Sequence, residues 1–238
     1  EGLTLGDVLK MAGGVKIDAD LSRIEVSRVN NAPASRVRAE LFNFTLPEAY
    51  AQNSEVQSDA LGFVFAPSPR QISPALAREI VKRLPPETVT VGVFRNEIPS
   101  RIIEIVNEAR LQGAQLHGHE TPAMTAEVAT DVRFVIKAVV AGSKDAASAK
   151  DFASDAILVD GLHPGSGTAY DWELLRDIPT DIRLMLSGGL TPENVAAGIA
   201  QVRPWGVDVS SGVEKAPGLK DAVKMRHFIT NARDAVLG

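Results

Sequence analysis

A regular alternation between two hydrophobic periods is the feature that most constrains the fold of this chain. From Arg36 onward, short apolar or β-branched runs alternate with stretches of helical periodicity. Strands that alternate with helices in this way predict a parallel sheet with crossover helices. The expected strands are Val37–Asn43, Ala60–Phe65, Thr88–Phe94, Ala114–His117, Phe134–Val140, Ala156–Asp160, Arg183–Leu186 and Gly206–Ser210.

The segments between these runs carry helix start signals. Ser73-Pro74 and Thr191-Pro192 each pair a good N-cap residue with proline at the first helical position. Thr45-Leu46-Pro47-Glu48 has the form of a capping box. The other expected helices are Pro99–Leu111, Thr121–Thr130, Lys144–Phe152, Asp171–Arg176 and Lys220–Ala235.

Eight strand–helix units predict an α/β fold of the closed (β/α)₈ type, the TIM barrel, over residues 36–238. A doubly wound open sheet is the rival, but it usually needs fewer units and a Gly-x-Gly-x-x-Gly turn after its first strand, which this chain lacks. Residues 1–35 do not fit the repeat. We expect them to form an N-terminal extension packed against the closed end of the barrel, with a lid or an oligomer contact as the alternative.

Composition excludes several classes of function. A formal net charge of −5 gives no basic field for nucleic acid. No apolar run approaches the roughly 20 residues that span a bilayer, and no secretory pattern opens the chain, so we expect a cytoplasmic protein without a membrane partner. The absence of cysteine excludes disulfides, thiolate metal sites and cysteine nucleophiles. None of the four histidines is spaced as a helix-borne ligand, and we expect no metal.

Two glycine clusters follow the last two expected strands. "LSGGLTPEN" places Ser187-Gly188-Gly189 before a capped helix, and "VDVSSGVEK" places Ser210-Ser211-Gly212 after the eighth strand. Glycine lets backbone N–H groups turn outward, and the loops after strands seven and eight are the usual phosphate site of this barrel. Ordinary turn glycine is the alternative. The candidate phosphate-binding residues are Gly188, Gly189, Ser211 and Gly212.

Other polar groups at strand ends are candidates for catalysis and binding. Asp160 closes an apolar run next to a glycine-rich loop, where a carboxylate is placed for proton transfer or for capping the turn. His163, in the same loop, is a possible second titrating group. Arg70 lies in the loop after the second expected strand, where its forked guanidinium suits a ligand carboxylate or phosphate.

These segments resemble the phosphoribosylanthranilate isomerase family from about Leu41 to the C-terminus. The similar segments, in the family's order and spacing, are "ALGFVFAPSPRQISP", "VGVF", "QLHG", "LVD…GSGTAYDW", "LSGGLTPENV" and "RPWGVDVSSGVEKAPGLKD". The resemblance implies the barrel fold and a cofactor-free Amadori rearrangement of N-(5′-phosphoribosyl)anthranilate in tryptophan biosynthesis, by a monomer or homodimer. It also implies that Asp160 is the general acid acting on the ring oxygen, that Arg70 holds the anthranilate carboxylate, and that the two glycine loops hold the phosphate.

The first strand departs from the family. The family reads Lys-Ile-Cys-Gly-Leu-Thr-x-Pro-Glu there, with the Cys as general base. Aligning Thr45–Glu48 with Thr-x-Pro-Glu puts Glu40 on the Lys and Phe42 on the Cys. "VKIDAD" imitates the same strand with Asp18 at the Cys, but it requires an unusually long first loop. His119 stands where the family is usually acidic. Asp18, Glu40 and His119 are therefore the candidate bases.

Three functions remain open at this point. The first is the same isomerase with a base other than Cys, and hence with weaker turnover, since one proton-transfer group contributes about 10²–10⁴ in rate. The second is a paralogue that acts on a related phosphoribosyl compound. The third is a non-catalytic barrel that binds a sugar phosphate. We favour the first, because a pure binder has no need of a proton donor at Asp160.

Overall fold

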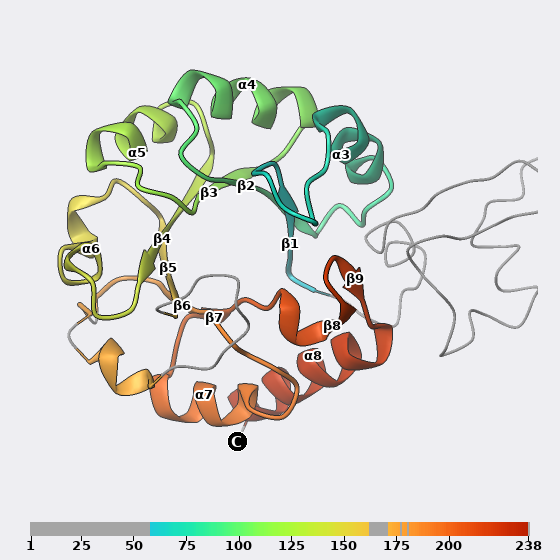
Figure 1. Ribbon diagram of the computed structural model, residues 1–238, viewed down its shortest axis with the longest axis vertical. Coiled ribbons are helices and arrows are strands. Elements are labelled where there is room, and N and C mark those ends of the chain that lie inside the picture. The colour runs from blue at the N-terminus through green and yellow to red at the C-terminus, as the bar shows by residue number, and fades with distance from the viewer. Residues whose placement is uncertain (1–57, 162–170, 177, 180, 238) are drawn as a thin grey trace, which may run out of the picture.

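The fold is seen in a computed structural model that describes residues 58–161, 171–176, 178–179 and 181–237 (Figure 1). The first expected strand, residues 1–35 and His163 lie outside these ranges. The same holds for Asp18, Glu40 and Phe42. The boundary between residues 35 and 36 therefore stays a prediction.

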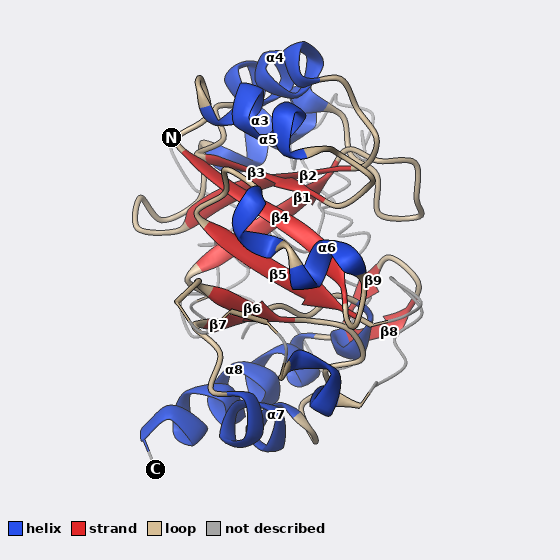
Figure 2. Cartoon of the chain, turned by 90° about the vertical axis from the view of Figure 1, so that its left-hand side faces the viewer, coloured by secondary structure: helices blue, strands red, loops and turns tan. Residues whose placement is uncertain are grey.

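Seven parallel strands form one curled sheet, and neighbours in the chain are neighbours in the sheet (Figures 1 and 2). Helices pack on the outer side, as expected for right-handed crossovers. Every strand predicted within the described ranges is present, within a few residues at its ends. The strands are β1 (Ala60–Val64), β2 (Val89–Phe94), β3 (Gly113–Leu116), β4 (Phe134–Val140), β5 (Ala156–Asp160), β6 (Leu184–Leu186) and β7 (Gly206–Val207).

The helices follow the predicted order. Ser73 is an N-cap whose hydroxyl accepts from Leu76 N, so Pro74 stands at the first helical position as predicted. Thr121 caps α5 in the same way, through Met124 N, with Pro122 at the first helical position. The described helices are α3 (Pro74–Val81), α4 (Pro99–Ala109), α5 (Pro122–Ala129), α6 (Lys144–Ala147), α7 (Val195–Val202) and α8 (Ala222–Leu237), with 3₁₀ turns η1 (Ala149–Asp151), η2 (Trp172–Leu175) and η3 (Ser211–Val213). In these ranges no helix is long and apolar enough to cross a membrane.

Four details differ from the sequence prediction. The helix expected over Lys144–Phe152 is the short α6 followed by the 3₁₀ turn η1. The Thr191 hydroxyl accepts from Glu193 N and caps a turn, not the first turn of a helix. The Asn194 side chain shapes the same turn by accepting from Thr191 N, and α7 begins only at Val195. The helix expected over Asp171–Arg176 is a short 3₁₀ turn. An antiparallel hairpin of β8 (Glu214–Ala216) and β9 (Leu219–Lys220) follows β7 and was not predicted.

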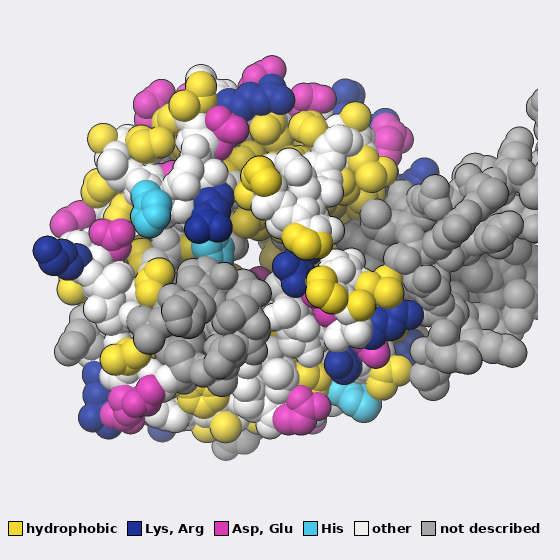
Figure 3. Space-filling model, viewed as in Figure 1, with side chains coloured by type: hydrophobic (Ala, Val, Ile, Leu, Met, Phe, Trp, Pro, Cys, Tyr) yellow, Lys and Arg dark blue, Asp and Glu magenta, His cyan; other side chains and the backbone are white. Residues whose placement is uncertain are grey.

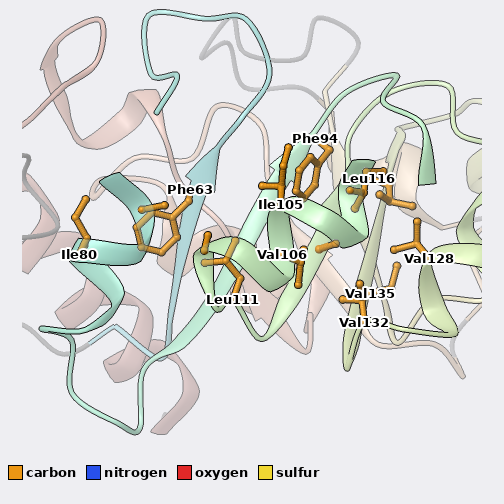
Figure 4. Close-up of a cluster of buried hydrophobic side chains, with 14 residues drawn as sticks. Phe63, Ile80, Phe94, Ile105, Val106, Leu111, Leu116, Val128, Val132 and Val135 are labelled. Atoms are coloured by element: carbon orange, nitrogen blue, oxygen red, sulfur yellow. The ribbon is translucent and has the colours of Figure 1, made fainter. Parts of the chain in front are cut away.

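Side chains alternate between two layers along each strand. Phe63, Phe94, Leu116 and Val135 pack in one cluster with helix residues such as Ile80, so they face the outer layer (Figure 4). A separate buried cluster draws on strands alone and fills the barrel interior; it consists of Val91, Ile136, Ala138, Ala156 and Leu158. The parity of each position therefore tells whether a polar side chain at a strand end faces the barrel or the helices.

Lys137 breaks the apolar pattern of the outer layer. It is 1% exposed, and its Nζ donates to Glu120 Oε2 at 2.9 Å and to the carbonyls of Leu116 and Gly118. Glu120, 2% exposed, also accepts from the backbone N–H groups of Asn96 and Gly118. One buried ion pair thus ties the C-terminal ends of β2 and β3 to the middle of β4.

Removal of the Lys137 ammonium is expected to destabilise the fold. Lys137→Met leaves the Glu120 carboxylate buried without its cation, which costs about 3–5 kcal/mol for a buried pair. Lys150→Met is the matched control, because Lys150 pairs with Asp181 at the surface, where the loss is at most about 1 kcal/mol. Urea unfolding measures both. Equal losses in the two variants would contradict the assigned role of Lys137.

Candidate active site

At the C-terminal ends of the strands, several polar side chains occupy positions that face the barrel interior. In β5, Asp160 shares the parity of the interior residues Ala156 and Leu158. The other positions are opposite in parity to outer-layer neighbours such as Leu116 and Leu186. The inward positions are His117 after β3, Asp160 ending β5, Ser187 after β6 and Asp208 after β7.

Asp160 is held by two contacts at the end of β5. It is 6% exposed, its Oδ1 accepts from Gly161 N at 2.8 Å, and its Oδ2 lies 3.2 Å from His117 Nε2. The Gln115 side-chain amide donates to His117 Nδ1 at 2.9 Å, which places the imidazole hydrogen on Nε2. His117 therefore donates to Asp160, and the contact brings an imidazole and a carboxyl group together where both can take part in proton transfer.

Asp208 is a second carboxylate of the interior. It is partly buried, and its Oδ2 accepts from the buried Ser187 hydroxyl at 3.1 Å. Burial raises the pKa of Asp208, and the nearby Asp160 carboxylate acts in the same direction. The Ser187 hydrogen bond and the nearby His117 and Lys220 side chains oppose this rise in pKa. The interior therefore holds two carboxylates in different surroundings.

The two predicted glycine loops meet in space. Gly188 and Gly189 adopt the left-handed backbone conformation, with φ of 79° and 67°. A Cβ on Gly212 would lie 1.8 Å from Leu190 O, so only glycine allows the second loop to approach the first so closely. The Asn194 amide braces the first loop by donating to Gly189 O at 2.9 Å. Phosphate binding between these loops stays a prediction.

Arg70 makes a bidentate ion pair with Glu214, a residue of the unpredicted β8–β9 hairpin. Its Nε and Nη2 each donate to the Glu214 carboxylate at 2.7 Å, and Lys220 Nζ donates to the same carboxylate at 2.9 Å. The hairpin reaches Arg70 because Gly218, with φ of 80°, lies close to the Pro69 carbonyl. The guanidinium is thereby fixed at the mouth of the barrel, with its Nη1 edge turned away from the Glu214 fork.

Of the sequence-predicted bases, only His119 lies in the described part of the chain. Its side chain is exposed, and its backbone N–H donates to Asn96 Oδ1. No contact joins it to Asp160 among the described residues. His117 and Asp208 were not singled out from the sequence, although "QLHG" and "GVDVSSG" contain them; the parity of each strand was the signal that could have identified them.

The space-filling view shows the face that carries the β8–β9 hairpin (Figure 3). This face is hollowed near its centre, and basic and histidine side chains lie beside the hollow. The carboxyl ends of the strands therefore surround an opening suited to an anionic molecule of small size.

Comparisons with known proteins identify the family. The sequence profile of N-(5′-phosphoribosyl)anthranilate (PRA) isomerase matches residues 43–231. The chain belongs to the phosphoribosylanthranilate isomerase family. The isomerase of Trichlorobacter lovleyi is 41% identical over 84% of this chain and 100% of its own length, and that of Thermotoga maritima is 43% identical over 83% and 98%. The family assignment made from the sequence is confirmed.

Solved structures of phosphoribosylanthranilate isomerases show the same fold. The Thermus thermophilus enzyme matches with a TM-score of 0.72 and 39% identity, over 80% of this chain and 95% of its own. A complex of such an isomerase with reduced 1-(o-carboxyphenylamino)-1-deoxyribulose 5-phosphate matches at 0.66 and 39%, over 79% and 92%. The predicted (β/α)₈ barrel is thereby confirmed as the fold class.

The Glu214 carboxylate is expected to make stability depend on acidity. Burial acts to raise its pKa, but the hydrogen bonds from Arg70 and Lys220 outweigh burial and lower that pKa from 4.5 to about 2. Because the pKa is lower in the folded state, the stabilisation is present above about pH 5 and is lost as the pH falls towards 2.

Glu214→Gln tests this dependence by urea unfolding between pH 6 and pH 2. We expect a free-energy difference from the unsubstituted protein that is constant above about pH 5 and shrinks below it. Glu127→Gln, at an exposed position, is the control. A difference for Glu214→Gln that does not vary with pH would show that the carboxylate is not charged in the fold as described.

Proposed function

We propose that this protein catalyses the Amadori rearrangement of N-(5′-phosphoribosyl)anthranilate, an aldose–ketose isomerisation of tryptophan biosynthesis. Membership of the family supports the reaction, and the contact between His117 and Asp160 inside the barrel is the observation that carries it. A buried carboxyl group hydrogen-bonded to a histidine suits proton transfer and is not needed for binding alone.

The first chemical step is assigned to the His117–Asp160 pair. Asp160 gives a proton to the ring oxygen O4′ as the C1′–O4′ bond breaks, and the ring opens to an iminium form. His117, one quarter exposed at its side chain, connects the buried Asp160 to solvent and can restore its proton. General acid catalysis of this kind contributes about 10²–10⁴ in rate.

The two anionic ends of the substrate are assigned to two different groups of the barrel mouth, the glycine loops and Arg70. The phosphate is proposed to bind backbone N–H groups of the joined loops at Gly188, Gly189, Ser211 and Gly212, which need no positively charged side chain. The anthranilate carboxylate is proposed to bind the Nη1 edge of Arg70, which Glu214 holds in orientation. The sugar then lies between these ends, across the barrel mouth.

The proposal includes a cytoplasmic location and a monomeric or homodimeric state. A solved structure supports the proposed oligomeric state. It is described as monomers generated from the dimeric phosphoribosylanthranilate isomerase of Thermotoga maritima, and it matches this chain with 37% identity and a TM-score of 0.66. A paralogue that acts on a related phosphoribosyl compound would use the same groups and is distinguished only by turnover.

Asp160→Asn is expected to reduce turnover of phosphoribosylanthranilate by at least about 10²-fold, because the amide keeps the size of the side chain but has no transferable proton. Steady-state kinetics measure the loss. Asp181→Asn, at an exposed position, is the control and should retain turnover. An Asp160→Asn protein as active as the control would remove the main support for the proposed mechanism.

Inorganic phosphate is expected to compete with the substrate and to bind where the two glycine loops meet. Asp160→Asn should leave this binding nearly unchanged, since Asp160 belongs to a different strand end from both loops. Calorimetric titration measures the affinity, and a phosphate-soaked crystal locates the anion. Phosphate found elsewhere, with the loops empty, would disprove this assignment.

A further inference from the structure

The rearrangement requires a second proton transfer that Asp160 does not explain. After ring opening, a base must remove the hydrogen on C2′. The chain has no cysteine for this step. Of the bases considered from the sequence, His119 is exposed and makes no described contact with the His117–Asp160 pair. Another proton acceptor is therefore needed, and the described interior contains one.

The strand register places such a group beside Asp160. Val159 pairs with Leu186, and Leu186 pairs with Val207. The next position along each strand is Asp160, Ser187 and Asp208, and the backbone bonds from Ser187 N to Val159 O and from Asp208 N to Leu186 O extend the ladder to it. Three inward polar residues thus form one row on three adjacent strands.

This row has the spacing that two proton transfers need. Adjacent strands lie about 4.8 Å apart, so the backbones at Asp160 and Asp208 are separated by roughly 10 Å across β6. Two carboxylates on such backbones can reach neighbouring atoms of one sugar from different sides. Ser187, between them, donates its hydroxyl hydrogen to Asp208 and not to Asp160, which fixes the direction of the Asp208 carboxylate.

We propose that Asp208 is the general base that takes the C2′ proton, with Ser187 as its positioning residue. This inference rests on the proposed isomerase function and names the group that does the work of the missing cysteine.

The proton transfers balance without any co-reactant. Asp208 takes the C2′ proton of the iminium form, the C2′–H electrons become the C1′=C2′ double bond, and the nitrogen recovers its electron pair. The O2′–H proton then returns to the His117–Asp160 pair as the C2′ ketone forms, and C1′ receives a proton from Asp208. Both carboxyl groups end as they began. C1′ is reduced and C2′ is oxidised by the same two electrons within the substrate, so no external oxidant or reductant is needed.

The surroundings of Asp208 are suited to this role. The titratable groups that act on it are His117 after β3, Asp160 at the end of β5 and Lys220 from the hairpin. Burial, with the charge of Asp160, raises the pKa of Asp208 above that of a free aspartate, and a carboxylate of higher pKa is a stronger base. The Ser187 hydrogen bond acts to lower that pKa, because it stabilises the ionised carboxylate.

The test compares Asp208→Asn with the unsubstituted protein and with the Asp181→Asn control. Substrate carrying deuterium at C2′ serves as the probe. We expect Asp208→Asn to lower kcat by about 10²–10⁴-fold, with KM within a few-fold. The deuterium isotope effect on kcat should be at least as large as in the unsubstituted protein, because removal of the C2′ hydrogen becomes the slow step.

A second pair of variants covers a folding failure of Asp208→Asn. Asp208→Glu keeps a carboxylate and should retain part of the activity. Ser187→Ala should shift the acidic limb of the kcat/KM profile to higher pH, because it removes a hydrogen bond that lowers the Asp208 pKa. A merely structural serine would change stability without moving that limb.

The outcomes separate this inference from the proposed function. If the unsubstituted protein does not turn over phosphoribosylanthranilate, the proposed function fails and the role of Asp208 fails with it. If it is active and Asp208→Asn keeps its kcat, or loses kcat while the isotope effect falls towards one, only the role of Asp208 is overturned. An unshifted profile in Ser187→Ala overturns the positioning role alone.

Discussion

In a curled parallel sheet, successive side chains point by turns into the barrel and out towards the helices. Here the outward positions are apolar and pack under the helices, and the inward positions fill the interior up to the strand ends. In the described strands the inner face becomes polar towards the ends, with Gln115 below His117 and then His117, Asp160, Ser187 and Asp208. The chemistry is therefore confined to one layer, where water and a substrate can enter, while the layers below stay dry.

Lys137 is the large exception to the apolar character of the outward positions, and it supports the site from the helix side of the sheet. Lys137 is outward and buried, and its bonds to the carbonyls on both sides of His117 fix the backbone of that histidine. Because the imidazole in turn contacts Asp160, the orientation of the proposed acid depends on an ion pair in the helix layer. A charged residue in a core is costly, and here it lies where the ends of β2 and β3 must be aligned with β4.

Apolar periodicity predicted the strands within the described ranges, because burial of alternate residues is a local property of the sequence. It also predicted that the glycine loops would be neighbours, since adjacent strand ends meet at one face. It did not reveal the partner of Arg70, because the β8–β9 hairpin has no hydrophobic pattern and contacts Arg70 from 144 residues away. Nor did it single out Asp208, since a lone aspartate near a glycine loop also reads as a turn residue until the register of β6 and β7 is known.

The outer core of the described residues falls into two clusters. One is built on β1 to β4 and the other from β4 onward to α8. Such an arrangement would let the halves of the barrel open as separate cooperative units. Two features join them: the apolar interior layer, which draws on strands of both halves, and the bond of Arg70 after β1 to Glu214 after β7. The bond that orients the arginine thus also links the first half to the second, so the geometry of the mouth and the cooperativity of unfolding share one contact.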